Sequence, residues 1–237
     1  MSKLKIRPLH VGTIKRPLIV FMVSPDPGKL IEAPLVCWYI EGGDKKILVD
    51  TGGGNPTLTE RPPYTRENEQ AIENALSNIG VQCDEIDIVI NTHLHWDHCS
   101  GNQLFPNAKI IVQEEELKSA RSPFPIHVSG YNSKMLEDIN YTLIKGDTQI
   151  IEGVKTIFVP GHTYGMQGVL VEAETKNYFI AADTISRYDS MMMKPPLISG
   201  INVDLKMYYD SLKKIDELSA TVLPGHDFDV FKKELYN

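Results

Sequence analysis

Cysteine and long apolar runs are scarce in this chain, and each scarcity excludes a class of protein. Only three cysteines occur among 237 residues, Cys37, Cys83 and Cys99, and their spacings do not form a disulfide framework. The apolar runs at residues 18–23 and 35–40 are far shorter than the roughly 20 residues that a membrane-spanning helix needs. The first residues lack the apolar region and cleavage site of a secretory signal. We therefore expect a cytoplasmic protein without membrane partners.

Positive charge is also in deficit, which argues against nucleic acid as a partner. Lysine and arginine number 24 against 31 acidic residues, a formal net charge of −7, and no basic stripe is present. A hydrophobic content of 42% and a charged content of 23% are ordinary for a soluble globular protein. Because no repeat, low-complexity segment or linker divides the sequence, we expect a single domain over residues 1–237, as a monomer or homodimer.

The histidines, by contrast, are clustered in a distinctive pattern. Five of the seven histidines lie, with two aspartates, in four short segments: His93-Leu94-His95-Trp96-Asp97-His98, Pro160-Gly161-His162, Ala182-Asp183 and Pro224-Gly225-His226. Imidazoles and carboxylates together suit zinc, iron, manganese or cobalt. We expect two divalent metal ions here, with zinc as the first choice. The two histidines outside these segments, His10 and His127, are expected to be ordinary packed residues.

Each histidine or aspartate segment follows a predicted strand. The strands concerned are expected at residues 86–91, 154–159, 178–182 and 221–223, and helices are expected at 67–79, 113–120 and 205–218. This order of elements favours two packed sheets with helices outside, a layered α/β fold. Since strand ends are rigid, loops that begin there can direct ligands to one point. The sequence therefore predicts that the four segments converge.

The spacing of the ligands suggests how they divide between two metals. His93 and His95 are two residues apart, so in an extended segment they point to the same side, and Asp97 and His98 come as the chain turns. We assign the first metal to His93, His95, His162 and Asp183, and the second to Asp97, His98, His226 and Asp183. Asp183 is shared because a carboxylate can bridge two ions, whereas an imidazole usually binds one.

Such a centre predicts hydrolysis of a small ester-like substrate. Two divalent ions lower the pKa of a shared water from 15.7 to about 7, and they polarise a carbonyl oxygen. We expect a metal-bridging hydroxide to attack an ester-like or phosphoryl centre. Asp50 is expected to hydrogen-bond to a metal ligand and orient it, without binding the metal itself. Trp96 either lines the pocket or packs beside it.

The motifs resemble those of a known superfamily. His93-Leu-His95-Trp-Asp97-His98, with Val49-Asp50-Thr-Gly, Pro160-Gly-His162-Thr and Gly225-His226-Asp, looks like the metallo-β-lactamase superfamily, from about Pro17 to Phe228. The resemblance implies an αββα four-layer sandwich with the metal site at one edge of the two sheets. It also implies that Asp97 is a metal ligand, as in dinuclear members.

Within that superfamily the sequence is most similar to the N-acyl-homoserine lactonases, through Pro27-Gly-Lys-Leu30, Pro34-Leu-Val-Cys37-Trp-Tyr and Ile111-Val-Gln113. This implies opening of a lactone ring, with Asp97 as a catalytic residue that moves the proton to the leaving oxygen. Two positions depart from the family. Ser186 stands where the family has a substrate-contacting tyrosine, the nearest tyrosine being Tyr188, and Met166 replaces a second histidine.

Alternatives remain for the substrate and for one segment. The segment 186–202 contains Met192 and Met193, which form either part of an acyl-chain pocket or a packed connection. The same metals could serve a thioesterase of the glyoxalase type, another hydrolase of this fold, or a di-iron redox protein. A purely structural metal is a further alternative, but structural sites are closed and mostly mononuclear.

Overall fold

Two β-sheets form the frame of the molecule. The computed structural model describes residues 4–56, 63–125 and 127–237. The first sheet has the order β4 (Tyr64–Thr65), β1 (Lys5–Pro17), β2 (Leu30–Glu41), β3 (Ile47–Val49), β5 (Ile88–Ile90), β6 (Lys109–Gln113) and β7 (Tyr141–Ile144). The second has the order β12 (Thr221–Pro224), β11 (Asn177–Ala182), β10 (Gln167–Glu172), β9 (Val154–Phe158) and β8 (Thr148–Ile151).

Strand direction determines where the connecting loops lie. In the first sheet β3, β5, β6 and β7 run parallel, so the loops that leave β3 and β5 start from the same edge. In the second sheet β11 and β12 are parallel and the other pairs are antiparallel. Open sheets of this kind bind ligands beyond the carboxyl ends of parallel strands. The predicted ligand segments follow β5, β9, β11 and β12.

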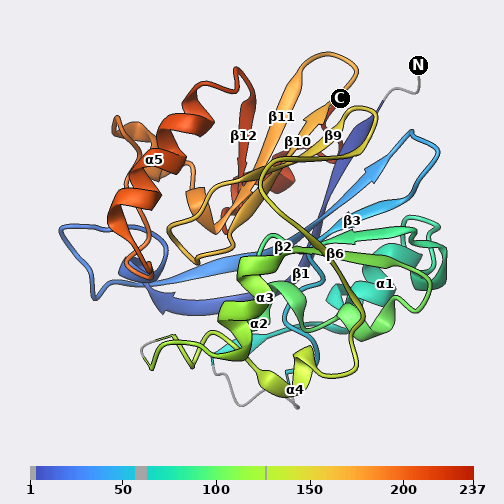
Figure 1. The fold of residues 1–237 in the computed structure, drawn as a ribbon, viewed down its shortest axis with the longest axis horizontal. Coiled ribbons are helices and arrows are strands. Elements are labelled where there is room, and N and C mark those ends of the chain that lie inside the picture. The colour runs from blue at the N-terminus through green and yellow to red at the C-terminus, as the bar shows by residue number, and fades with distance from the viewer. Residues whose placement is uncertain (1–3, 57–62, 126) are drawn as a thin grey trace.

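Alternation along β2 shows how the layers pack. Val36, Trp38 and Ile40 point into the core between the two sheets, and Leu35 and Tyr39 point to the opposite face. This is the period of two that a strand imposes on its side chains. The strand is buried on both faces from Ala33 to Ile40, as expected for a strand between two layers. Figure 1 shows the two sheets face to face.

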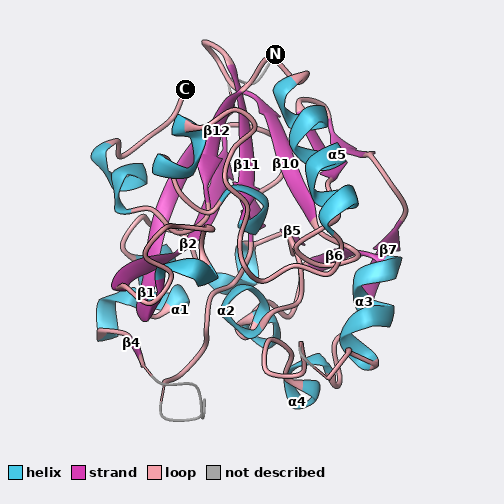
Figure 2. Cartoon of the chain, turned by 90° about the vertical axis from the view of Figure 1, so that its left-hand side faces the viewer, coloured by secondary structure: helices cyan, strands magenta, loops and turns pink. Residues whose placement is uncertain are grey.

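Helices cover the outer faces of both sheets (Figures 1 and 2). The α-helices are α1 (Ile72–Ser77), α2 (Trp96–Cys99), α3 (Glu114–Arg121), α4 (Ser133–Leu136) and α5 (Leu205–Asp216). The short 3-10 helices are η1 (Leu18–Val20), η2 (Asn68–Gln70), η3 (Cys83–Glu85), η4 (Asn102–Leu104), η5 (Asp183–Ile185), η6 (Asp189–Met192) and η7 (Phe228–Lys232). Among the described residues, no helix combines the length and apolar character needed to cross a membrane.

The outer helices attach through narrow apolar stripes. α1 buries Ile72 and Leu76 against the first sheet. α5 buries Tyr208, Leu212 and Ile215, four and three residues apart, against the second. The sheets therefore lie between helical layers, and the predicted αββα sandwich is confirmed.

Two elements differ from the sequence prediction. The single helix expected at 67–79 is interrupted at Ala71, whose extended backbone (ψ 131°) separates η2 from α1. β1, a strand of 13 residues, was not predicted. Its pairing with β2 shifts between His10 and Thr13, because a β-bulge there breaks the alternation on which the prediction depends.

Candidate metal centre

The seven predicted side chains lie together at one edge of the two sheets. His93 and His95 occupy the loop between β5 and α2, and Asp97 and His98 lie in α2. The other three come from the second sheet: His162 follows β9, Asp183 begins η5 after β11, and His226 follows β12. The four segments thus converge as predicted, although strands from two different sheets supply them.

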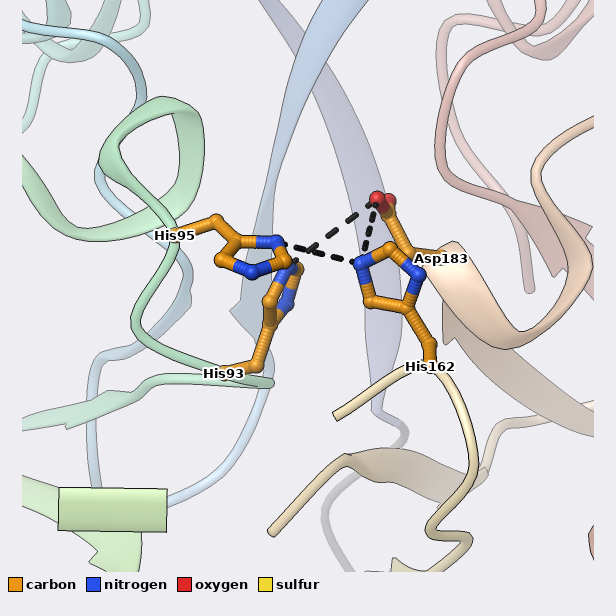
Figure 3. A group of neighbouring side chains, drawn as sticks. All are labelled: His93, His95, His162 and Asp183. Carbon is orange, nitrogen blue, oxygen red and sulfur yellow. Dashed lines mark hydrogen bonds and ion pairs between the residues drawn. The ribbon is translucent and has the colours of Figure 1, made fainter. Parts of the chain in front are cut away.

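The first group contains His93, His95, His162 and Asp183 (Figure 3). Nδ1 of His95 lies 3.0 Å from Nε2 of His93 and 3.1 Å from Nε2 of His162. Asp183 Oδ2 lies 3.3 Å from Nε2 of His162 and 4.0 Å from Nε2 of His93. The four side chains direct one atom each to a common point.

The second group contains Asp97, His98 and His226. Asp97 Oδ2 lies 3.9 Å from Nε2 of both histidines. Asp183 reaches this group through its other oxygen, since Oδ1 lies 3.2 Å from Nε2 of His98 and 2.9 Å from Nε2 of His226. The two oxygens of Asp183 therefore face two different sets of histidines.

Hydrogen bonds at Nδ1 orient three of the histidines, His98, His162 and His226, so that Nε2 of each faces the cluster. Nδ1 of His98 donates to Asp50 Oδ2, at 2.7 Å. Nδ1 of His162 donates to the carbonyl of Ile201, and Nδ1 of His226 to that of Pro34, both at 2.9 Å. Because each Nδ1 faces an oxygen acceptor, Nε2 of the neutral imidazole presents a lone pair toward the cluster. This is the tautomer that a metal ligand requires.

These lone pairs have no donor to satisfy them. Nε2 of His98 and Oδ1 of Asp183 are buried without a hydrogen-bond partner, although buried polar atoms are normally paired. Acceptors crowded at about 3 Å repel one another unless a cation lies between them. The residues present therefore fit a divalent metal, and the histidine and aspartate groups indicate one.

Burial and mutual charge set the ionisation of the cluster. Burial lowers the pKa of His93 and His95 well below the usual value, and neighbouring imidazoles add to the effect. Burial also lowers the pKa of His162. Burial opposes ionisation of Asp183, but the His226, His98 and His162 side chains outweigh it and hold its pKa well below the usual range. Burial also opposes ionisation of His98 and His226, but the Asp183 carboxylate, joined at His98 by Asp50, outweighs it and raises the pKa of both. The neutral imidazoles and the ionised carboxylate of the first group are the forms that bind metal, and at the second group a metal ion would take the place of the imidazole protons.

Asp50 occupies the position predicted for a supporting carboxylate. Besides the proton of His98, it accepts hydrogen bonds from the backbone N–H and the hydroxyl of Thr92, both at 2.7 Å. Its backbone has a positive φ of 61°, which is uncommon for residues other than glycine and which aspartate tolerates better than most. Thr92 in turn lies 3.2 Å from Nδ1 of His93. Asp50 thus orients the ring of His98 directly and reaches His93 through Thr92.

A cavity of about 480 Å³ opens over the cluster, a size typical of small-molecule sites. Five of the seven predicted ligands line it together with Trp96: His95, Asp97, His162, Asp183 and His226. Trp96 also packs edge-on against Tyr64, with ring centroids 5.3 Å apart. Both suggestions made for this tryptophan therefore apply.

The remaining predicted contacts lie elsewhere. Tyr188 packs against the core between the sheets. Met192 and Met193 are 84% and 56% exposed. Met193 lines a second cavity of about 560 Å³, between η6 and α5, whereas the lining of the cavity over the cluster contains none of these three residues.

Several residues around the centre escaped the sequence analysis. Arg16, His127 and Asn202 line the cavity, and no motif marks them. His127 was expected to be an ordinary packed histidine, and only the fold brings it to this wall. Glu116 is fully buried behind the cluster. The sequence does indicate its burial, because a glutamate four residues before the buried Ala120 lies on the apolar face of a short helix.

Comparison with known proteins identifies the family. The metallo-beta-lactamase superfamily pattern matches residues 33–226, which include every proposed ligand. This chain belongs to the metallo-beta-lactamase superfamily. The predicted class, a metal-dependent hydrolase, is thereby confirmed.

Relatives within the superfamily include named lactonases. The N-acyl homoserine lactonase AiiA of Bacillus thuringiensis subsp. kurstaki is 30% identical over 221 residues, covering 86% of this chain and 85% of that protein. A probable metallo-hydrolase of Methanocaldococcus jannaschii is 34% identical over 172 residues, covering 72% of this chain and 71% of that protein. The resemblance to lactonases predicted from the motifs is confirmed.

A solved structure extends the likeness to the whole fold. An N-acyl homoserine lactone hydrolase, with the product N-hexanoyl-L-homoserine bound at its catalytic metal centre, superposes with a TM-score of 0.83. It is 26% identical, and the superposition covers 98% of this chain and 96% of that one.

Proposed function

We propose that this member of the metallo-beta-lactamase superfamily is a dinuclear metal-dependent lactonase. The observation that carries the proposal is the placement of Asp183, whose two oxygens face separate sets of histidines. One carboxylate between two sets of ligands is the arrangement expected of a two-metal centre. The named lactonases among the relatives support a lactone as the substrate.

Two divalent ions, with zinc as our first choice, would supply a bridging hydroxide as the nucleophile and polarise the carbonyl that it attacks. His93, His95, His162 and Asp183 would hold one ion, and Asp97, His98, His226 and Asp183 the other. The hydrogen bonds from Nδ1–H of His98, His162 and His226 to fixed oxygens keep these imidazoles from rotating.

Asp97 is the residue that we assign to proton transfer. Its oxygen stands 3.9 Å from the two nearest imidazoles, farther than the contacts of Asp183 with the same rings, and its side chain lines the cavity. A carboxylate so placed can bind a metal, take a proton from the attacking water and deliver it to the ring oxygen that leaves. The ester bond of the lactone breaks, and a hydroxy acid results.

The departures from the lactonase pattern bear on substrate preference. Ser186 is buried, and its carbonyl accepts the backbone N–H of His226 at 2.8 Å, so it supports a ligand turn. Met166 is fully buried in the core beneath α5. Neither side chain lines the cavity over the cluster. We therefore expect weaker recognition of the homoserine amide than in enzymes with the tyrosine, and activity toward lactones in general.

Turnover on matched panels of lactones, thioesters and phosphodiesters tests the proposal, on protein whose metal content has been measured. We expect γ-lactones to be opened fastest, at two metals per chain. Metal-replete protein that cleaves a thioester but spares lactones would instead indicate a thioesterase of the glyoxalase type. One tightly held metal and no turnover would indicate a structural site.

A further inference from the structure

Glu116, on α3, is a buried carboxylate outside the proposed ligand set. Its side chain is completely excluded from solvent, and burying a charged or polar group in this way is costly unless it is fully hydrogen-bonded. Both oxygens of Glu116 accept hydrogen bonds. Oε1 accepts the backbone N–H of Leu94 at 2.9 Å and the hydroxyl of Tyr131 at 3.2 Å, and Oε2 accepts the backbone N–H of Gly165 at 3.1 Å.

The two backbone donors belong to two ligand loops. Leu94 lies between His93 and His95 in the loop that leaves the first sheet. Gly165 comes three residues after His162, in the loop that leaves the second. One carboxylate therefore connects the loops from the two sheets that supply the three histidines of the first group.

Close packing reinforces this connection. A Cβ atom at residue 165 would lie 2.2 Å from the backbone nitrogen of Glu116, so only glycine lets the second loop reach the helix. On the other side, the ring of Tyr131 packs against that of His95, with centroids 4.8 Å apart. Tyr131 thus contacts a proposed ligand with its ring and Glu116 with its hydroxyl.

We infer that Glu116 is a positioning residue that sets the distance between the His93–His95 loop and the His162 loop, and so determines metal affinity at the first group. The inference rests on the proposed metal-binding role of the cluster. Three donors point at the carboxylate, from Leu94, Tyr131 and Gly165, and a carboxylate has two oxygens to accept them. A glutamine must turn its NH2 group toward at least one of these donors, so Glu116→Gln keeps the volume but breaks the connection.

Zinc affinity measured at each group separately tests this role without any substrate. His226→Ala removes a ligand of the second group, and His95→Ala one of the first, so each background retains one intact group. Glu116→Gln is then added to each, and zinc dissociation constants are obtained by competition with a chelator. We expect about 10–100-fold weaker binding in the His226→Ala background, the range seen when a supporting partner of a ligand is removed, and unchanged binding in the His95→Ala background.

Glu115→Gln is the matched control. It makes the same chemical change on the same helix, one residue away, but its side chain is exposed and pairs with Lys118, at 3.6 Å. It should leave both affinities unchanged. Tyr131→Phe removes one of the three donors and keeps the carboxylate, so it should weaken the first group in the same direction by a smaller factor. This second variant also serves if metal-free Glu116→Gln fails to fold.

The outcomes separate the two proposals. Equal weakening at both groups would assign Glu116 a general structural role, and no weakening at either would remove any role in metal binding; each result overturns the inference while the proposed function stands. Failure of the parent chain to bind zinc, cobalt, manganese or iron would overturn both proposals together.

Discussion

Two carboxylates of the cluster hold different positions, and this difference assigns them different tasks. Asp183 lies within 3.3 Å of imidazole nitrogens in both groups, which suits a fixed bridge. Asp97 approaches its imidazoles only to 3.9 Å and faces the cavity. A side chain with a looser hold and access to substrate is the better candidate for moving a proton.

Asp97→Asn tests that division. Asparagine keeps an oxygen near His98 and His226 but cannot accept a proton, so we expect turnover to fall by a factor of about 10²–10⁴. The measurement is kcat on a γ-lactone with metal content counted for each preparation. Wild-type turnover at full metal occupancy would falsify the proton-transfer role.

Asp50→Asn is expected to act on metal affinity. Asp50 accepts three hydrogen bonds, from the backbone N–H and the hydroxyl of Thr92 and from Nδ1–H of His98, each at 2.7 Å. The NH2 group of an asparagine would face at least one of these donors and could not accept its hydrogen bond. Loss of such a partner typically weakens metal binding 10–100-fold. Zinc competition in the His95→Ala background, where only the group containing His98 is intact, measures the effect. An unchanged dissociation constant there would contradict the orienting role of Asp50.

Among the elements, the short loops that follow strands carry the site, and their glycines permit unusually close approaches. Gly161, before His162, has a φ of 140°, and a Cβ there would lie 2.4 Å from the Cα of Tyr208 in α5. The loop therefore packs directly on the helix backbone. The position of His162 is fixed by this contact as well as by its bond to Ile201.

Gly165→Ala is predicted to destabilise the fold. The new methyl group would overlap the first turn of α3 at 2.2 Å from a backbone atom, and backbone cannot move aside as a flexible side chain can. Overpacking of this kind costs about 1–3 kcal/mol or more. The free energy of unfolding from denaturant titration measures it. Gly28→Ala is the control, because nothing lies within 4 Å of a Cβ at that position, and it should change stability little.

Elements with clear periodicity could be predicted from the sequence, and elements that depend on partners could not. The spacing of Tyr208, Leu212 and Ile215 predicted α5 closely. β1 was missed because its bulge removes the alternation and its order comes from pairing with β2. The metal segments were found because five of the seven histidines lie with two aspartates in four short segments that each follow a strand. Glu116 was overlooked although it lies on the buried face of α3, and its contacts with two ligand loops exist only after those loops meet. His127 was not found because only the fold brings it to the cavity wall.

A surface interaction near β3 and β5 gives a pH-dependent prediction. Hydrogen bonds from the Lys45 ammonium and the Lys46 backbone lower the pKa of the Asp87 carboxyl. A carboxyl whose pKa is depressed by folding stabilises the fold above the unfolded-state pKa of about 3.9, and the contribution is lost as pH falls through the folded-state value. Asp87→Asn should therefore be less stable than wild type at pH 7.

The stability difference between wild type and Asp87→Asn, measured by denaturant titration, should shrink as pH falls below about 4. Asp84→Asn, in η3 three residues before Asp87, is a suitable comparison. A difference that stays constant from pH 7 to pH 3 would show that Asp87 acts through something other than its charge.

At the scale of the whole molecule, the proposed metals join the two sheets. His93, His95, Asp97 and His98 come from the first sheet, and His162, Asp183 and His226 from the second. Since metal binds the folded state alone, it stabilises by about 2.7 kcal/mol when present at 100 times its dissociation constant. A chelator should accordingly lower the Tm of metal-loaded protein and restored zinc should raise it, as differential scanning calorimetry can measure. Equal Tm values with and without metal would contradict this.

Because the ligands are divided between the sheets, the centre can form only when both sheets are present. Strands β1 to β7 complete the first sheet, and β8 to β12 complete the second, so a cut between Ile144 and Thr148 would separate the ligands of each proposed metal. Neither fragment alone would hold a full set, and reassociation would be reported by restored zinc binding. The chain therefore offers a natural split reporter, in which a metal signal requires both pieces to find each other.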